Sequence, residues 1–203
     1  MSVAFHLQAA CAVRDLALVA HCVHLFLTDA VPFASLVERV AAVDALMLAV
    51  QTFNKQPTFL APCLGAIAHA AGFDAPIPVA TILRAVRPHE RDVQVVQSAA
   101  RLFSEHVSTP RVLQDLPLLS AAVARWLKNH PRDQDVAYWG AHVLLQAAAQ
   151  EPNVVSSQHG SFGAGDVAIA VVTGATAVRT IQVYVAGRPW NACVLETLYP
   201  RLR

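Results

Sequence analysis

The sequence places one group of possible metal ligands or nucleophiles close together, namely His21, Cys22 and His24. Imidazole and thiolate bind zinc, and a Cys–His pair can act in nucleophilic catalysis. Side chains share a helix face when they are three or four residues apart, but Cys22 is one and two residues from its histidines. We therefore interpret Cys22 as a packed helix residue, and we predict no metal site and no catalytic residue.

A second candidate is the glycine-rich stretch at Gly160, Gly163 and Gly165, because backbone N–H groups at the start of a helix can bind phosphate. The spacing is not GxGxxG, no strand is expected before it, and no Walker-type lysine follows. The stretch lies within residues 151–166, which are rich in Ser and Gly and too many for a tight turn. We predict a flexible surface loop there, and no cofactor.

Composition limits the classes of partner. The 203 residues carry 15 Lys+Arg and 14 Asp+Glu, a net charge of +1 that creates no long-range field to attract a nucleic acid. Only 14% of the residues are charged, against about 25% in an average soluble domain, and 55% are hydrophobic. We expect no nucleic-acid partner, and a chain with few charged groups to cover its surface.

The apolar excess does not predict a membrane protein, because the apolar runs at 16–27 and 167–178 are shorter than the roughly 20 residues needed to span a bilayer. The N-terminus has neither the positive start nor the cleavage site of a signal peptide. The cysteines form no CxxC pair, which favours small core residues in a reducing compartment; they are Cys11, Cys22, Cys63 and Cys193. We predict a cytoplasmic protein without a membrane span.

Apolar residues recur at three- and four-residue spacing along the whole chain, which predicts an all-α fold. We expect one domain, 1–203, of about ten helices. The expected helices are 3–13, 16–29, 34–52, 57–71, 77–86, 91–107, 112–129, 133–150, 166–184 and 190–199.

An internal repeat is the most informative feature. Residues 80–103 align without gaps with residues 121–144, at an offset of 41. Both copies contain an apolar helix, then His-x-x-Asp, then a helix with small residues in its middle. A weaker copy without His-x-x-Asp lies 36 residues upstream of the first. A period near 40 residues is typical of stacked helix pairs, because one pair cannot bury its own apolar face.

The His-x-x-Asp residues have local structural roles in this interpretation. Asp92 and Asp133 are placed to accept hydrogen bonds from the first backbone N–H groups of the following helix, as structural caps. His89 and His130 are expected near the carboxyl end of the preceding helix, where imidazole interacts favourably with the helix dipole.

This pattern resembles the armadillo/HEAT-like helical-repeat superfamily, most clearly over 123–149 and next over 82–107. The resemblance implies an α-α superhelix. Peptide-binding armadillo proteins line a groove with Asn residues and place Trp one turn earlier. The aligned Asn positions hold His69, Glu105 and Gln146, and the aligned Trp positions hold Gly65, Arg101 and His142. The departure argues against an importin-like peptide groove, but polar residues on apolar helices make His69, Arg101, Glu105, His142 and Gln146 candidate partner-binding residues. The alternative is a solvated helix face.

The terminal helices are apolar over much of their length, although terminal repeats need a polar outer face to stay soluble. We therefore expect self-association or a protein partner at one end, and predict a non-catalytic scaffold or adaptor, possibly within a larger assembly. The alternative is an all-α enzyme or small-molecule binder with a pocket between helices that uses buried His residues.

Overall fold

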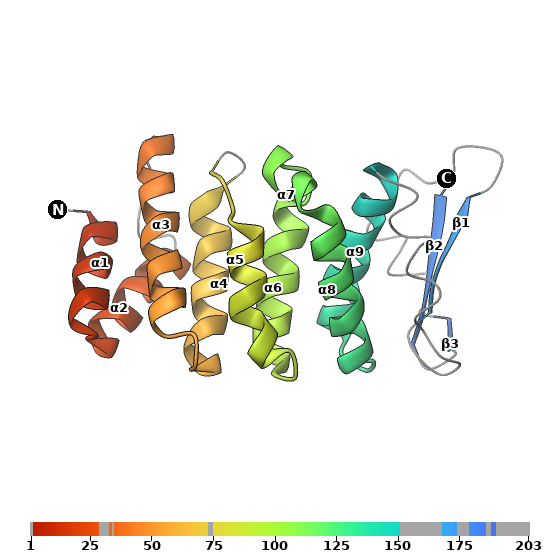
Figure 1. The fold of residues 1–203 in the computed structure, drawn as a ribbon, viewed down its shortest axis with the longest axis horizontal. Helices are drawn as coiled ribbons and strands as arrows, with labels where there is room; N and C mark the ends of the chain where they lie inside the picture. Colours follow the sequence, from red (N-terminus) through yellow and green to blue (C-terminus); the bar gives the residue numbers. More distant parts are fainter. Residues whose placement is uncertain are drawn as a thin grey trace.

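The computed structural model describes residues 2–28, 33, 35–72 and 75–150 and three strands at 168–173, 179–185 and 188–189, with side chains described up to residue 144. Helices account for nearly all of the region before residue 151 (Figure 1). They are α1 (Val3–Val13), α2 (Leu16–Leu27), α3 (Leu36–Thr52), α4 (Pro57–Ala71), α5 (Val79–Val86), the 3-10 helix η1 (Arg87–His89), α6 (Val93–His106), α7 (Pro110–Gln114), α8 (Leu116–Asn129) and α9 (Gln134–Gln150).

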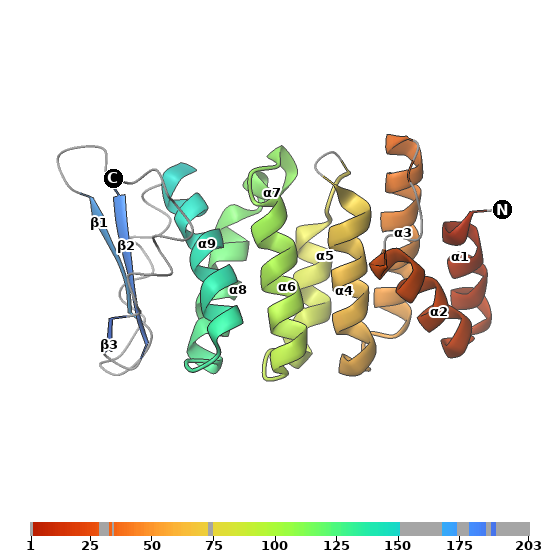
Figure 2. The same cartoon turned by 180° about the vertical axis from the view of Figure 1, so that it is seen from behind.

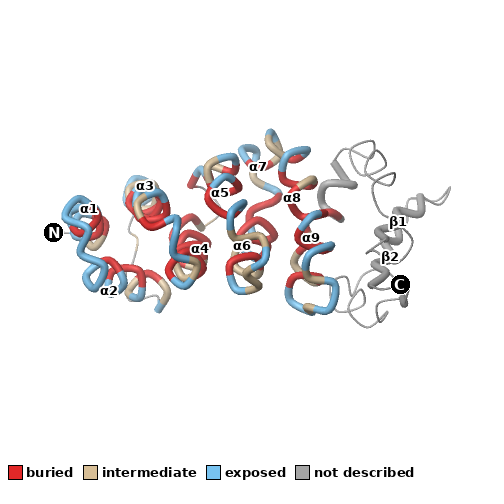
Figure 3. Tube along the Cα trace, turned by 60° about the horizontal axis from the view of Figure 1, so that its bottom comes forward, coloured by how far each residue is buried: buried red, intermediate tan, exposed pale blue. Residues whose placement is uncertain are grey.

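The helices follow one another along the long axis in two layers. One layer contains α1, α3, α5 and α8, each in contact with the next, and the other contains α2, α4, α6 and α9 in the same relation. Figure 3 shows the two rows, and Figures 1 and 2 show them from opposite sides. Short turns join α1 to α2, α3 to α4, η1 to α6 and α8 to α9, and all four turns lie at the same edge.

Capping residues fix the helix ends. The side chains of Ser2, Asp15, Ser35 and Asp92 accept hydrogen bonds from backbone N–H groups in the first turns of α1, α2, α3 and α6. The helix α4 begins instead at Pro57, whose missing N–H costs nothing at a first turn.

The core is one continuous cluster of aliphatic, alanine and aromatic side chains that involves every α-helix from α1 to α9. Leu46, Ile67 and Phe103 are fully buried at its centre. Figure 3 shows buried residues in each of these helices. Alanine is frequent in the core, which lets neighbouring helices approach closely. Gly140 of α9 also faces Val123 and Leu127 of α8.

The all-α prediction is confirmed for the region up to residue 150. Two of the expected helices, one inside and one outside this region, need correction. The expected helix 112–129 is interrupted at Asp115 into α7 and α8, because Pro117 lacks an N–H and its ring clashes with the carbonyl four residues earlier. The expected helix 166–184 is wrong. Residues there form antiparallel strands β1 (Ala168–Thr173) and β2 (Arg179–Val185), followed by β3 (Arg188–Pro189).

The strands contain Val171, Val172, Thr180, Ile181 and Val183, β-branched residues that favour strand over helix. The register pairs Thr173 with Arg179. The helix predicted at 190–199 and the loop predicted at 151–166 lie outside the described residues.

Candidate partner-binding surfaces

The groove residues inferred from the repeat lie on the layer formed by α4, α6 and α9. His69 of α4 is exposed. On α6, Arg101 Nε donates to Glu105 Oε1 over 2.8 Å, and the two side chains are 54% and 35% exposed. The structure therefore presents His69, Arg101 and Glu105 to solvent. The side chain of Gln146 is outside the described region.

His142 differs from these three residues because it is held between helices. Its Nδ1 lies 2.6 Å from the Oγ of Ser104 on α6, close enough for a hydrogen bond, and the ring is half-buried. Burial lowers the pKa of His142, and an interaction with the Ser104 backbone opposes this effect. Its placement fits a contact that joins α6 to α9 better than a freely presented binding residue.

His106 is a buried titratable group that the sequence did not single out. It is 3% exposed near the end of α6, its Nε2 donates to the Ala68 carbonyl of α4 over 3.4 Å, and its Nδ1 has no hydrogen-bond partner. Burial lowers the pKa of His106, while the bond to Ala68 and the Glu105 carboxylate act in the opposite direction. The neutral ring is therefore the form that the folded protein accommodates.

This burial predicts a pH-dependent stability. The pKa of His106 is lower in the folded than in the unfolded chain, so below the unfolded value of about 6.5 the unfolded chain binds more protons. The free energy of unfolding should fall as the pH drops below that value, by up to about 1.4 kcal/mol per pH unit for one histidine, and His142 should add to the trend. Urea denaturation at pH 7.5 and at lower pH measures this. His106→Leu should show a smaller pH dependence than the wild type, and an unchanged slope would contradict the assignment.

The turns at the shared edge carry the His-x-x-Asp repeat. Asp92 accepts hydrogen bonds from Gln94 N and Val95 N at the start of α6. Asp133 accepts one from Val136 N over 2.8 Å at the start of α9. Both carboxylates therefore have the geometry of helix caps. Asp133 also accepts two bonds of 3.1 Å from the side-chain amide of Gln97 on α6, which ties the two helices together.

The two repeat histidines connect successive turns. The Nε2 of His89 donates to the carbonyl of Asn54 over 2.6 Å, and the Nε2 of His130 donates to the carbonyl of Glu90 over 2.8 Å. The weaker repeat copy has an offset of 36 residues, so Asn54 in one turn aligns with Glu90 in the next turn. Each histidine therefore binds the equivalent carbonyl of the preceding turn. Sequence reasoning placed both residues near helix ends but missed this contact, which depends on the stacking of the helix pairs.

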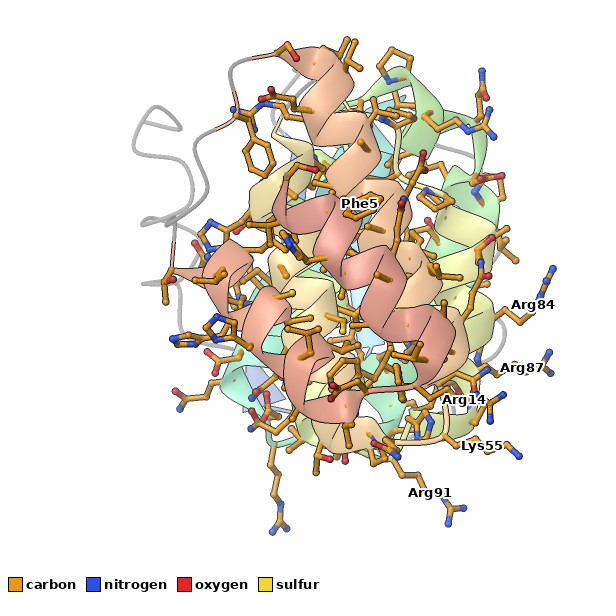
Figure 4. The ribbon with its side chains drawn as sticks, turned by 90° about the vertical axis from the view of Figure 1, so that its left-hand side faces the viewer. Phe5, Arg14, Lys55, Arg84, Arg87 and Arg91 are labelled. Atoms are coloured by element: carbon orange, nitrogen blue, oxygen red, sulfur yellow. The ribbon has the colours of Figure 1, made fainter. Side chains whose placement is uncertain are left out.

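The first helix pair exposes apolar side chains. Phe5 and Val13 of α1 are 54% and 75% exposed, and Leu16 and Leu18 of α2 are 41% and 38% exposed. Figure 4 looks onto this end, with Phe5 near the centre of the view. The opposite side of the pair packs on α3 and α4. This combination of a packed inner side and an apolar outer side is unlike the expected polar cap of a helical array.

The cysteines of the described region are core residues. Cys11, Cys22 and Cys63 are buried and free, and burial raises the pKa of all three thiols, with the proximity of Cys11 adding to the effect at Cys63. His21 and His24 are exposed on either side of the buried Cys22. Among the described residues, no group of three or more His, Cys, Asp or Glu side chains is arranged to hold a metal ion. No helix in the same region has the length and apolar character to cross a membrane.

Comparison of the chain with family models, with curated proteins and with solved structures gives no match.

Proposed function

We propose that the protein is a non-catalytic scaffold or adaptor with an armadillo/HEAT-like helical-repeat architecture, which binds a protein partner or a second copy of itself through the apolar end at α1 and α2. The repeat pattern in the sequence and the two-layer order of the helices support the architecture. Free, buried thiols fit a reducing compartment such as the cytoplasm.

The exposed apolar side of the first helix pair is the observation that carries this proposal. The inner pairs have neighbours on both sides, whereas α1 and α2 pack on α3 and α4 on one side and carry Phe5, Val13, Leu16 and Leu18 as exposed residues. Exposed apolar residues continue on the adjacent α3 at Leu36, Val37 and Leu48. Clustered apolar side chains on a surface usually mark a contact with another protein. Burying them against a helix of similar character would stabilise a complex by the same hydrophobic effect that joins one pair to the next.

The face with His69, Arg101 and Glu105 is a secondary part of this proposal. The ion pair of Arg101 and Glu105 is exposed, so its net contribution to stability is small. Both side chains are therefore available to a partner without loss of the fold. His142 is better placed as a structural contact, since it already bonds Ser104.

The experiment compares two surface substitutions at the proposed end with a matched control elsewhere. The double variant Phe5→Ser/Leu16→Ser removes apolar groups at α1 and α2, and Leu118→Ser removes a leucine on α8 that is 50% exposed. We expect self-association in sedimentation velocity, or a reproducible set of proteins in affinity capture, for the wild type and for Leu118→Ser but not for the double variant. A wild-type protein that stays monomeric at high concentration and captures no protein would contradict the proposal, and so would equal behaviour of the double variant.

A further inference from the structure

Exposed cations occur at every turn of the shared edge. Arg14, Lys55, Arg91 and Arg132 each stand one residue before the cap position of the second helix of a pair, and all four are exposed. Figure 1 shows these turns at one edge, and Figure 4 shows Arg14, Lys55 and Arg91 on the same side of the molecule. The copy at Arg14-Asp15 lies 41 residues before Lys55-Gln56 and extends the repeat beyond what the sequence had indicated.

Two further arginines, Arg84 in the last turn of α5 and Arg87 in η1, point outward beside this row (Figure 4). We call the six residues the basic edge: Arg14, Lys55, Arg84, Arg87, Arg91 and Arg132. Across the part of the chain that is described, none of these side chains has an ion pair or a hydrogen bond.

The carboxylates beside the basic edge already have hydrogen-bond or ion-pair partners other than its cations. Asp15, Asp92 and Asp133 accept hydrogen bonds from helix N–H groups, and Glu90 pairs with Arg125 over 2.9 Å. A cation in the last turn of a helix also stabilises the helix dipole. This local role does not explain Lys55, Arg91 and Arg132, which lie beyond the last turns of α3, η1 and α8.

We propose that the basic edge binds an extended acidic segment of a protein partner, with Asp or Glu at about every third residue. This inference rests on the proposed role in binding protein and names a partner chemistry at a second surface. Packed helices lie about 8–10 Å apart, so successive turns repeat at about that distance. An extended chain advances about 3.3–3.6 Å per residue, so three residues span one turn-to-turn step.

The side-chain chemistry and the rigidity of the edge favour this partner. Five of the six cations are Arg, whose planar guanidinium binds a carboxylate through two parallel hydrogen bonds. The bonds from His89 to Asn54 and from His130 to Glu90 fix successive turns relative to each other, so less conformational freedom is lost on binding. An Asp cap directly follows the cation at three of the four turns, an arrangement that suits separate carboxylates better than the continuous negative charge of a membrane or a nucleic acid. The net charge of +1 also argues against a nucleic-acid partner, because binding to a phosphate backbone depends on many basic side chains.

The test is fluorescence anisotropy with the whole chain and a labelled synthetic peptide of Glu-Ser-Ser repeats, about 15 residues long so that it spans four turns. We expect binding that weakens with added salt. The triple variant Lys55→Glu/Arg91→Glu/Arg132→Glu should lower the affinity by about tenfold or more, because three exposed attractions become repulsions. Circular dichroism checks that the variant is folded. Arg111→Glu, at an exposed position on α7 near the opposite edge, should bind like the wild type.

Further probes decide between partner classes. A peptide with the same number of Glu residues in one block should bind more weakly than the spaced peptide. Absence of binding by the wild type, unchanged binding by the folded triple variant, or tighter binding to oligothymidylate or to phosphatidylserine vesicles would each overturn the inference. If the wild type captures a protein partner through α1 and α2 but does not bind the peptide, the basic edge alone is rejected. If the wild type binds the peptide but Phe5→Ser/Leu16→Ser changes neither self-association nor affinity capture, the proposed apolar end is rejected instead.

Discussion

Trp126→Ala is expected to destabilise the fold by about 3–5 kcal/mol. Trp126 lies in α8, is 1% exposed and stacks on Phe103 of α6 with 6.4 Å between ring centroids. It is the largest fully buried side chain of the described region. Its removal loses the favourable burial of the indole and leaves a cavity between α6 and α8 that the surrounding helices can fill only in part.

Urea denaturation followed by circular dichroism measures this loss, with two comparisons. Leu118→Ala, at an exposed position on the same helix, should change the free energy of unfolding by less than about 0.5 kcal/mol. Trp126→Phe should cost less than Trp126→Ala, because the phenyl ring fills much of the cavity that alanine leaves. The indole Nε1 has no hydrogen-bond partner, so its loss breaks no bond in either variant. A cost below about 1 kcal/mol for Trp126→Ala would show that α6 and α8 are not packed through this residue.

Gly140→Val should destabilise the protein by about 2–3 kcal/mol, toward the upper part of the range for overpacked cores. A Cβ atom at Gly140 would lie 3.2 Å from the Val123 Cγ1 and 3.2 Å from the Leu127 Cδ2 of α8. Both neighbours are buried, Val123 at 0% and Leu127 at 1% exposure. The added branches of valine would therefore force α8 and α9 apart.

Gly140→Ala is the matched control for this contact. Its single Cβ also comes close to α8, but alanine gains about 1 kcal/mol of helix propensity over glycine, so we expect a stability close to that of the wild type. Thermal or urea unfolding of the two variants separates packing from propensity. A valine variant as stable as the alanine variant would mean that α8 and α9 do not approach closely at this position.

Much of the helical fold could be predicted from the sequence because local and tertiary signals agree there. Apolar spacing together with Asp and Pro at helix starts gave the bounds of α1, α4 and α9 to within a residue or so. The strand pair could not be predicted in the same way. Residues 168–173 are a short apolar run, and such a run fits either a buried helix or a strand. The β-branched residues of β1 and β2 were the signal that favoured strands.

The candidate surfaces show a similar limit. The alignment placed His69, Arg101 and Glu105 on exposed helix positions, since exposure on a helix follows its period. The half-burial of His142 depends on Ser104 of another helix, and spacing along one helix cannot reveal such a partner. The basic edge was missed for a different reason. Its four turn cations, Arg14, Lys55, Arg91 and Arg132, are about 40 positions apart in the sequence, and a net charge near zero conceals a local excess of cations.

The bonds of His89 and His130 have a consequence for how such a chain can be altered. They fix the turns at one edge, whereas the short helix α7 lies in the connection from α6 to α8 at the opposite edge. Tags, reporter peptides or whole inserted modules should therefore be tolerated between α6 and α7. The same insertions between α8 and α9 would break the link between adjacent pairs. Insertions should therefore be made at the edge that carries α7, and the edge with the histidine bonds should be left unchanged.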